Sequence, residues 1–98
     1  MELEQLTRDS FAPLLDTSFE VALVGSPALD LKLASIGTAG AGLPGVREPF
    51  SLIFHGPLAP TLPQGTFTLA HATLGQLSIF IVPIGPLGAA MRYEAIFS

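Results

Sequence analysis

The sequence contains no cysteine. Disulfide bonds, thiolate metal sites and cysteine nucleophiles are therefore excluded, and the redox compartment is left open. A chain of 98 residues forms one domain, which we expect to span residues 1–98, and buries only about 60–65% of the surface that it exposes when unfolded. Because no covalent cross-link assists, the packing of apolar side chains has to stabilise the fold.

Charge is also scarce. Charged residues make up 12% of the chain and hydrophobic residues 49%, whereas globular domains usually carry about 25% charged residues. This composition is typical of a folded domain and not of a disordered one. Eight acids and four bases give a net charge of −4, and the bases are scattered along the sequence. A nucleic-acid partner is therefore not expected.

One long segment has no formal charge. The 43 residues from Pro49 to Met91 include no Asp, Glu, Lys or Arg, where average composition would supply roughly ten. Prolines and glycines interrupt this segment, so no stretch of about twenty apolar residues is left for a membrane-spanning helix. The amino end, "MELEQLTRDSF", lacks the basic and apolar regions of a secretory signal, so classical export is not indicated and the cellular location stays open.

Apolar periodicity predicts a short helix followed by strands. Leu3, Leu6 and Leu14 recur at roughly helical spacing. Thr7 can cap this segment and Pro13 stops it, which predicts a short helix before residue 16. Alternation with a period of two then predicts six strands, near 19–25, 29–36, 50–55, 66–71, 76–83 and 91–97. The spacing favours an all-β domain, a small antiparallel barrel or sandwich of about six strands with a short N-terminal helix.

Turn signals predict the connections. Gly25-Ser26-Pro27 joins the first two strands as a hairpin, and "HATLGQ" reverses the chain between the fourth and fifth strands. Pro63-Gln64-Gly65 fits a type I turn. It predicts that the segments 50–55 and 66–71 pair with each other as a further hairpin.

That pairing separates the two histidines of the chain. His55 would lie opposite Thr66, and His71 opposite Phe50. At about 3.3 Å per residue the histidines then stand on the order of 16 Å apart. A metal shared between them is not expected.

No pattern commits the chain to catalysis. The glycines of "GAGLPG" are not followed by the Lys-Ser/Thr pair or the capped helix of a phosphate-binding loop. The acidic and hydroxyl side chains of 16–20 have no histidine near them in sequence, and turn chemistry explains them. An enzyme that uses His55 or His71 with Glu94 remains as a minor alternative. We predict no catalytic residue, no cofactor and no metal.

The segment "LSIFIVPI", residues 77–84, has no polar face. Ile79 and Ile81 alternate with an equally apolar set, Phe80, Val82 and Ile84. The strand therefore needs cover on both sides. The N-terminal helix or a tightly closed sheet can provide the second cover, and the alternative is a neighbouring subunit.

Polar side chains without charge accompany this strand, and they can pack against another chain without desolvating an ion. We therefore predict an interface formed by Ile79, Phe80, Ile81, Val82, Ile84, Thr66 and Thr68. Four charged residues at the two ends of the uncharged segment are candidates for a polar rim around that interface. They are Arg47, Glu48, Arg92 and Glu94.

Five blocks resemble a family of small uncharacterised bacterial domains of about this length. They are "FAPLLDTSFEVAL", "REPFSLIFHGP", "LPQGTFTLAH", "LGQLSIFIVPIG" and "RYEAIFS", so the resemblance spans nearly the whole chain. It implies no activity and no catalytic residues. Members of that family are often encoded near proteins with phage-tail-collar-like domains, which implies a partner of that kind and an assembled structure.

These observations predict a non-enzymatic structural or assembly protein. We expect a subunit or accessory of a homomeric assembly, such as a fibre or a phage-tail-like particle, whose partner is a second copy of itself in an oligomer or filament. The alternative comes from a different class. It is a small β-barrel that binds an apolar ligand in a cavity lined by Phe50, Phe54, Phe67 and Tyr93.

Overall fold

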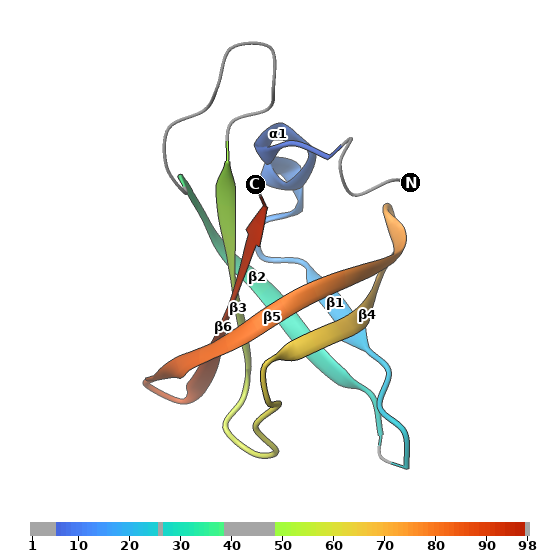
Figure 1. The fold of residues 1–98 in the computed structure, drawn as a ribbon, viewed down its shortest axis with the longest axis vertical. Helices are drawn as coiled ribbons and strands as arrows, with labels where there is room; N and C mark the ends of the chain where they lie inside the picture. Colours follow the sequence, from blue (N-terminus) through green and yellow to red (C-terminus); the bar gives the residue numbers. More distant parts are fainter. Residues whose placement is uncertain (1–5, 26, 39–48, 98) are drawn as a thin grey trace.

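The computed structural model describes residues 6–25, 27–38 and 49–97. A helical turn, α1 (Arg8–Phe11), continues into a 3-10 turn, η2 (Ala12–Leu14). The strands are β1 (Ser18–Val21), β2 (Leu29–Thr38), β3 (Phe50–Pro57), β4 (Gly65–His71), β5 (Gly75–Leu87) and β6 (Ala90–Phe97). Every strand pair is antiparallel, and the strands close into a barrel in the order β1-β2-β3-β6-β5-β4 (Figure 1). The predicted all-β fold of six strands with a short N-terminal helix is confirmed, and its form is the barrel.

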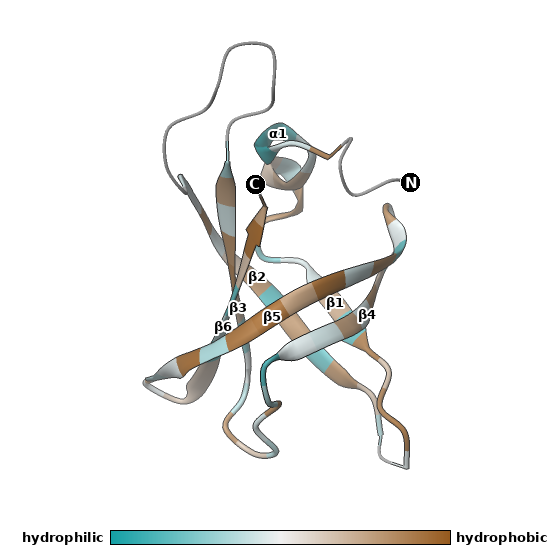
Figure 2. Cartoon of the chain, in the orientation of Figure 1, coloured by the Kyte–Doolittle hydropathy of each residue, from teal (hydrophilic) through white to brown (hydrophobic). Residues whose placement is uncertain are grey.

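Alternation along the strands builds the core. In β3, for example, Phe50, Leu52 and Phe54 are buried while Ser51 and Ile53 are only half-buried. Figure 2 shows the resulting bands of apolar and polar residues along the strands. Because successive side chains of a strand point to opposite faces, one set from each strand fills the interior of the barrel.

The helical segment lies over one end of the barrel (Figure 1). The Thr7 amide donates to Ser10 Oγ at 3.0 Å, which satisfies one backbone group at the helix start. Phe11 is fully buried, with its ring 5.5 Å from that of Phe97 and 5.9 Å from that of Phe50. The helix thus adds to the inner core.

In the described part of the chain, no helix combines the length and apolarity needed to cross a membrane.

The predicted hairpin of 50–55 with 66–71 is wrong. β3 pairs with β2 and β6, whereas β4 pairs with β1 and β5. The connection between β3 and β4 is instead anchored to the barrel, since Leu62 is buried and its amide donates to Tyr93 Oη at 2.9 Å. This partner lies 31 residues away in sequence, so the local turn signal at Pro63 could not indicate it.

Strand β5 is longer than predicted. It pairs with β4 over residues 75–81 and with β6 from Val82 to Leu87, and it passes through Pro83 and Pro86. Proline lacks an N–H, so it disrupts a sheet only on a side where a neighbouring strand needs that donor. At Pro83 and Pro86, β5 has a described partner on one side only, which is β6. A register shift between Pro83 and Gly85 adds one residue, Ile84, to this edge.

Gly56 provides a test of the interior packing. A Cβ atom at this position would lie 2.6 Å from Leu31 Cδ2 and 3.4 Å from Tyr93 Cε2, both of which belong to buried residues. We expect Gly56→Ala to lower the free energy of unfolding by about 1–3 kcal/mol, since the core has to shift to admit a methyl group. Urea unfolding followed by circular dichroism measures the change.

The matched control is Gly65→Ala. A Cβ atom there would lie 3.7 Å from Phe67 Cε2, an ordinary contact distance. We expect the stability of this variant to stay within about 0.5 kcal/mol of the wild type. Equal losses in the two variants would contradict the close approach at Gly56.

Candidate functional site

The outward sides of β4 and β5 form a surface without charge. Cross-strand pairs place Thr66 opposite Phe80, Thr68 opposite Ser78, and Ala70 opposite Gln76. Five of these six side chains are exposed, and Ala70 is half-buried. We call this surface the outer β4–β5 face, formed by Thr66, Thr68, Ala70, Gln76, Ser78 and Phe80.

The same side of the sheet becomes more apolar along β5. Phe80 is 53% exposed, Ile84 37% and Leu87 59%, and Val82 is half-buried. Figure 2 shows the central part of β5 as predominantly hydrophobic. A soluble-type surface normally scatters such side chains singly, whereas here they follow one another along a single strand.

Charged side chains border the outer β4–β5 face on the β1 side and its apolar continuation along β5 on the β6 side. On β1, Glu20 lies opposite Ala70. On β6, Glu94 lies opposite Val82, and Arg92 is opposite Gly85. The uncharged surface is therefore about two strands wide and is framed by polar positions, which is the layout of an apolar interface with a polar rim.

The residues predicted for the interface divide into two sets. Ile79 and Ile81 are 2% and 0% exposed and point into the barrel, so they are removed from the interface. Four of the others lie on the outside as the interface requires, and Val82 lies beside them, half-buried. The exposed ones are Thr66, Thr68, Phe80 and Ile84.

The predicted rim is only partly described. Arg47 and Glu48 lie outside the described residues. Arg92 does not act as a free surface charge, since its Nε donates to the Gly85 carbonyl at 3.1 Å and its side chain also reaches the Ile84 carbonyl at 3.4 Å. Arg92 therefore holds the irregular part of β5 in place, and Glu94 lies on the same side of β6.

The two histidines are placed differently from the prediction. His55 lies opposite Lys32 on β2 and Arg92 on β6, on the outer side of the barrel. His71 is buried, with its ring 4.5 Å from that of Phe19. The spacing inferred from a 50–55 and 66–71 hairpin no longer applies. Over residues 6–25, 27–38 and 49–97, no group of three His, Asp or Glu side chains is arranged to hold a metal.

His71 belongs to a chain of hydrogen bonds. The Thr73 amide donates to Nδ1 at 3.0 Å, so the ring proton lies on Nε2. Nε2 is 2.8 Å from Thr17 Oγ1, and this hydroxyl donates to the Leu14 carbonyl at 2.6 Å. Nε2 is therefore the donor to Thr17. The imidazole connects the segment after η2 to the turn between β4 and β5.

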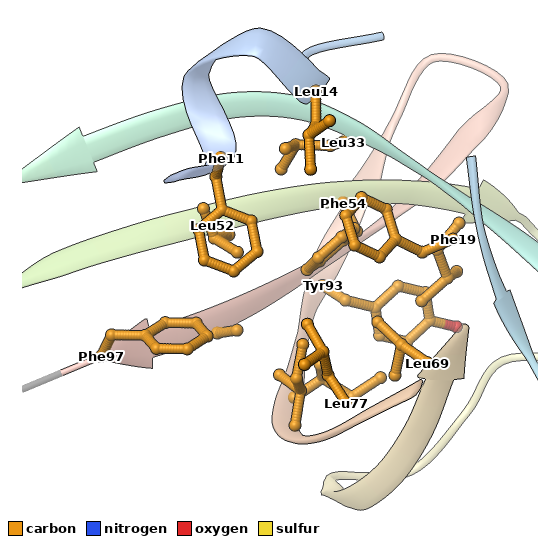
Figure 3. Close-up of a cluster of buried hydrophobic side chains, with 14 of the residues drawn as sticks. Phe11, Leu14, Phe19, Leu33, Leu52, Phe54, Leu69, Leu77, Tyr93 and Phe97 are labelled. Atoms are coloured by element: carbon orange, nitrogen blue, oxygen red, sulfur yellow. The ribbon is translucent and has the colours of Figure 1, made fainter. Parts of the chain in front are cut away.

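The side chains proposed for an apolar cavity fill the core instead. The ring of Phe50 stacks on that of Phe97 at 4.8 Å and 7°, and Phe54 meets Phe19 edge-on at 5.3 Å. Tyr93 is fully buried. Figure 3 shows Phe54, Tyr93 and their neighbours pointing toward one another from different strands. This packing gives no support to the ligand-binding alternative.

The relative positions of His55 and Glu94 bear on the catalytic alternative. His55 and Glu94 lie on the same outer side of the barrel, because His55 is opposite Arg92 and Ile53 is opposite Glu94. They are diagonal neighbours across β3 and β6. His71 is separated from Glu94, since it points inward from β4.

Comparison with known protein families identifies the family to which the chain belongs. One family model, described as "Domain of unknown function (DUF6916)", matches residues 6–97. The chain belongs to the DUF6916 family. This confirms the resemblance to a family of small domains of unknown function, and the family description assigns no reaction, ligand or partner to the DUF6916 domain. Searches of the curated proteins and of the solved structures find no match.

The His71 network leads to a stability prediction. We expect His71→Ala in the DUF6916 domain to lower the free energy of unfolding by about 2–4 kcal/mol, because the core loses a ring and the Thr73 amide loses its acceptor. His55→Ala should cost less than about 1 kcal/mol, since this side chain lies on the outer wall. Urea unfolding measures both variants.

Metal removal is the companion measurement. Dialysis against a chelator should leave the unfolding midpoint of the wild type and of both variants unchanged. A stoichiometric metal that survived dialysis and whose removal unfolded the chain would show that the histidines serve a metal site after all.

Proposed function

We propose that this DUF6916 domain is a non-enzymatic structural or assembly protein. It acts as a subunit or accessory of a homomeric assembly, of which a fibre or a phage-tail-like particle is an example. The observation that carries the proposal is the outer β4–β5 face with its apolar continuation through Ile84 and Leu87. These side chains are exposed while the interior of the barrel is already occupied by other apolar residues.

The energetics favour covering this surface. Full burial of a phenylalanine side chain contributes about 1.5–3 kcal/mol of stabilising free energy. Because Phe80 is half-exposed, a partner that covers it would gain roughly half of that free energy. The threonine and serine side chains beside it can be covered without desolvating an ion, which would cost several kcal/mol. The gain comes from the apolar side chains, and the neighbouring polar groups impose little penalty.

The engagement of His71 supports a non-enzymatic role. Both of its ring nitrogens have partners within the fold. A histidine that acts as a general base needs a free nitrogen within reach of the substrate. The inward position of His71 therefore fits a structural function.

A charge placed on β5 tests the proposal. We expect Phe80→Lys to remain folded and to lose self-association, because position 80 faces outward and a lysine there would be desolvated in the contact. Ile79→Lys should unfold the chain, since position 79 is in the core. Size-exclusion chromatography with light scattering measures the mass, and circular dichroism measures folding.

The matched control is Val24→Lys. Val24 lies in the turn after β1 and is fully exposed, so this variant carries the same added charge away from the outer β4–β5 face. It should associate like the wild type. A monomeric wild type at high concentration, or a Phe80→Lys variant that associates as the wild type does, would refute this role for the face.

A further inference from the structure

Resting on this proposed function, we infer that the partner of the outer β4–β5 face is the same face of a second copy. The two copies pack face to face about a two-fold axis and form a closed dimer. Two features of the described residues carry the inference. They are the hydrogen-bonding chemistry of the face and the distribution of charge over the rest of the barrel.

The polar groups of the face can pair with their own copies. Thr66, Thr68 and Ser78 carry hydroxyl groups, and Gln76 carries an amide. Each of these groups both donates and accepts hydrogen bonds. Across a two-fold axis the same patch meets itself, so a group near the axis faces its own symmetry mate. A hydroxyl satisfies that requirement, whereas a carboxylate or an ammonium group would meet a like charge.

The outer side of β1 and β2 does not have this property. On β1 and β2, Glu20 lies directly opposite Asp30, and Lys32 follows on the same side of β2. A second copy laid on this wall would bring acidic side chains toward acidic side chains, in a chain of net charge −4. Charge complementarity therefore favours the outer β4–β5 face over the β1–β2 wall for contact between identical chains.

Packing of faces explains the exposed side chains better than addition of a strand. A strand added to an edge of β5 would pair with backbone groups and would leave Phe80 uncovered. The edge formed by residues 82–87 also contains Pro83 and Pro86, which have no N–H to donate, and an irregularity at Ile84. Only a surface laid over the face covers Phe80, and when the same face covers it about a two-fold axis the contact joins two copies. A longer assembly would need a second contact surface.

The absence of cysteine from the wild type makes the geometry testable in the full chain. Thr68 and Ser78 are cross-strand neighbours in the middle of the face. A single cysteine at either position should approach its symmetry mate in the dimer. The matched control is Ser35→Cys, an exposed serine on β2, which lies three strands from β5 in either direction around the barrel.

The experiment combines light scattering over a hundredfold range of concentration with mild oxidation of Thr68→Cys, Ser78→Cys and Ser35→Cys. We expect a limiting mass of twice the 10.2 kDa chain, a covalent dimer from at least one of the two variants on the face, and none above background from Ser35→Cys. Phe80→Lys combined with the same cysteine should abolish the cross-link.

The other outcomes separate this inference from the proposed function. A mass that keeps growing with concentration, or a closed oligomer larger than a dimer, overturns the two-fold contact and leaves homomeric assembly standing. A dimer that cross-links through Ser35→Cys, or through none of the three cysteines, also overturns the two-fold contact. A wild type that is monomeric at every concentration overturns both.

Discussion

The aromatic packing inside the barrel is the interaction on which the other features depend. Phe11 from the helical segment meets Phe19, Phe50 and Phe97 from three different strands, with ring centroids 5.5–6.5 Å apart. Aromatic pairs at such distances add stabilisation beyond the area that they bury. Because a small chain buries a modest fraction of its surface, each of these buried rings matters for its stability.

Two polar contacts attach the connecting segments to this core. Tyr93 Oη accepts the amide of Leu62, and the His71 ring lies between Thr17 and Thr73. Each polar side chain is buried, and each finds the partner that a buried polar group requires. These contacts hold the segment after η2 and the β3–β4 connection against the barrel. Both ring nitrogens of His71 are therefore engaged in hydrogen bonds within the fold.

The interior of the barrel is filled, and further apolar side chains lie on its outer surface. Three of the exposed large apolar side chains, Phe80, Ile84 and Leu87, follow one another along β5. They lie near hydroxyl side chains of β4 and charged positions of β1 and β6. The long uncharged segment of the sequence therefore serves two purposes in the proposed picture. One set of its side chains builds the core, and the alternate set forms a contact surface.

Alternation in the sequence determined much of this structure, because successive side chains of a strand must face opposite ways. It predicted six strands, and it indicated that the strand at 77–84 has two apolar faces. It could not decide whether Ile79 or Phe80 faces inward. Pairing with β4 decided this, since Ile79 lies opposite Phe67 and next to the buried Leu77–Leu69 pair.

Contacts between distant residues were decided only by the tertiary structure. The type I turn signal at Pro63 predicted a hairpin that does not form, because β3 pairs with β2 and β6 while β4 pairs with β1 and β5. His71 showed no local sign of its role, since its partner Thr17 lies 54 residues away. The position of the helix was open as well, and the ring contacts of Phe11 placed it over the end of the barrel and not over the outer side of β5. Local sequence fixes backbone preference and periodicity, whereas the choice of neighbours depends on packing that the whole chain has to satisfy together.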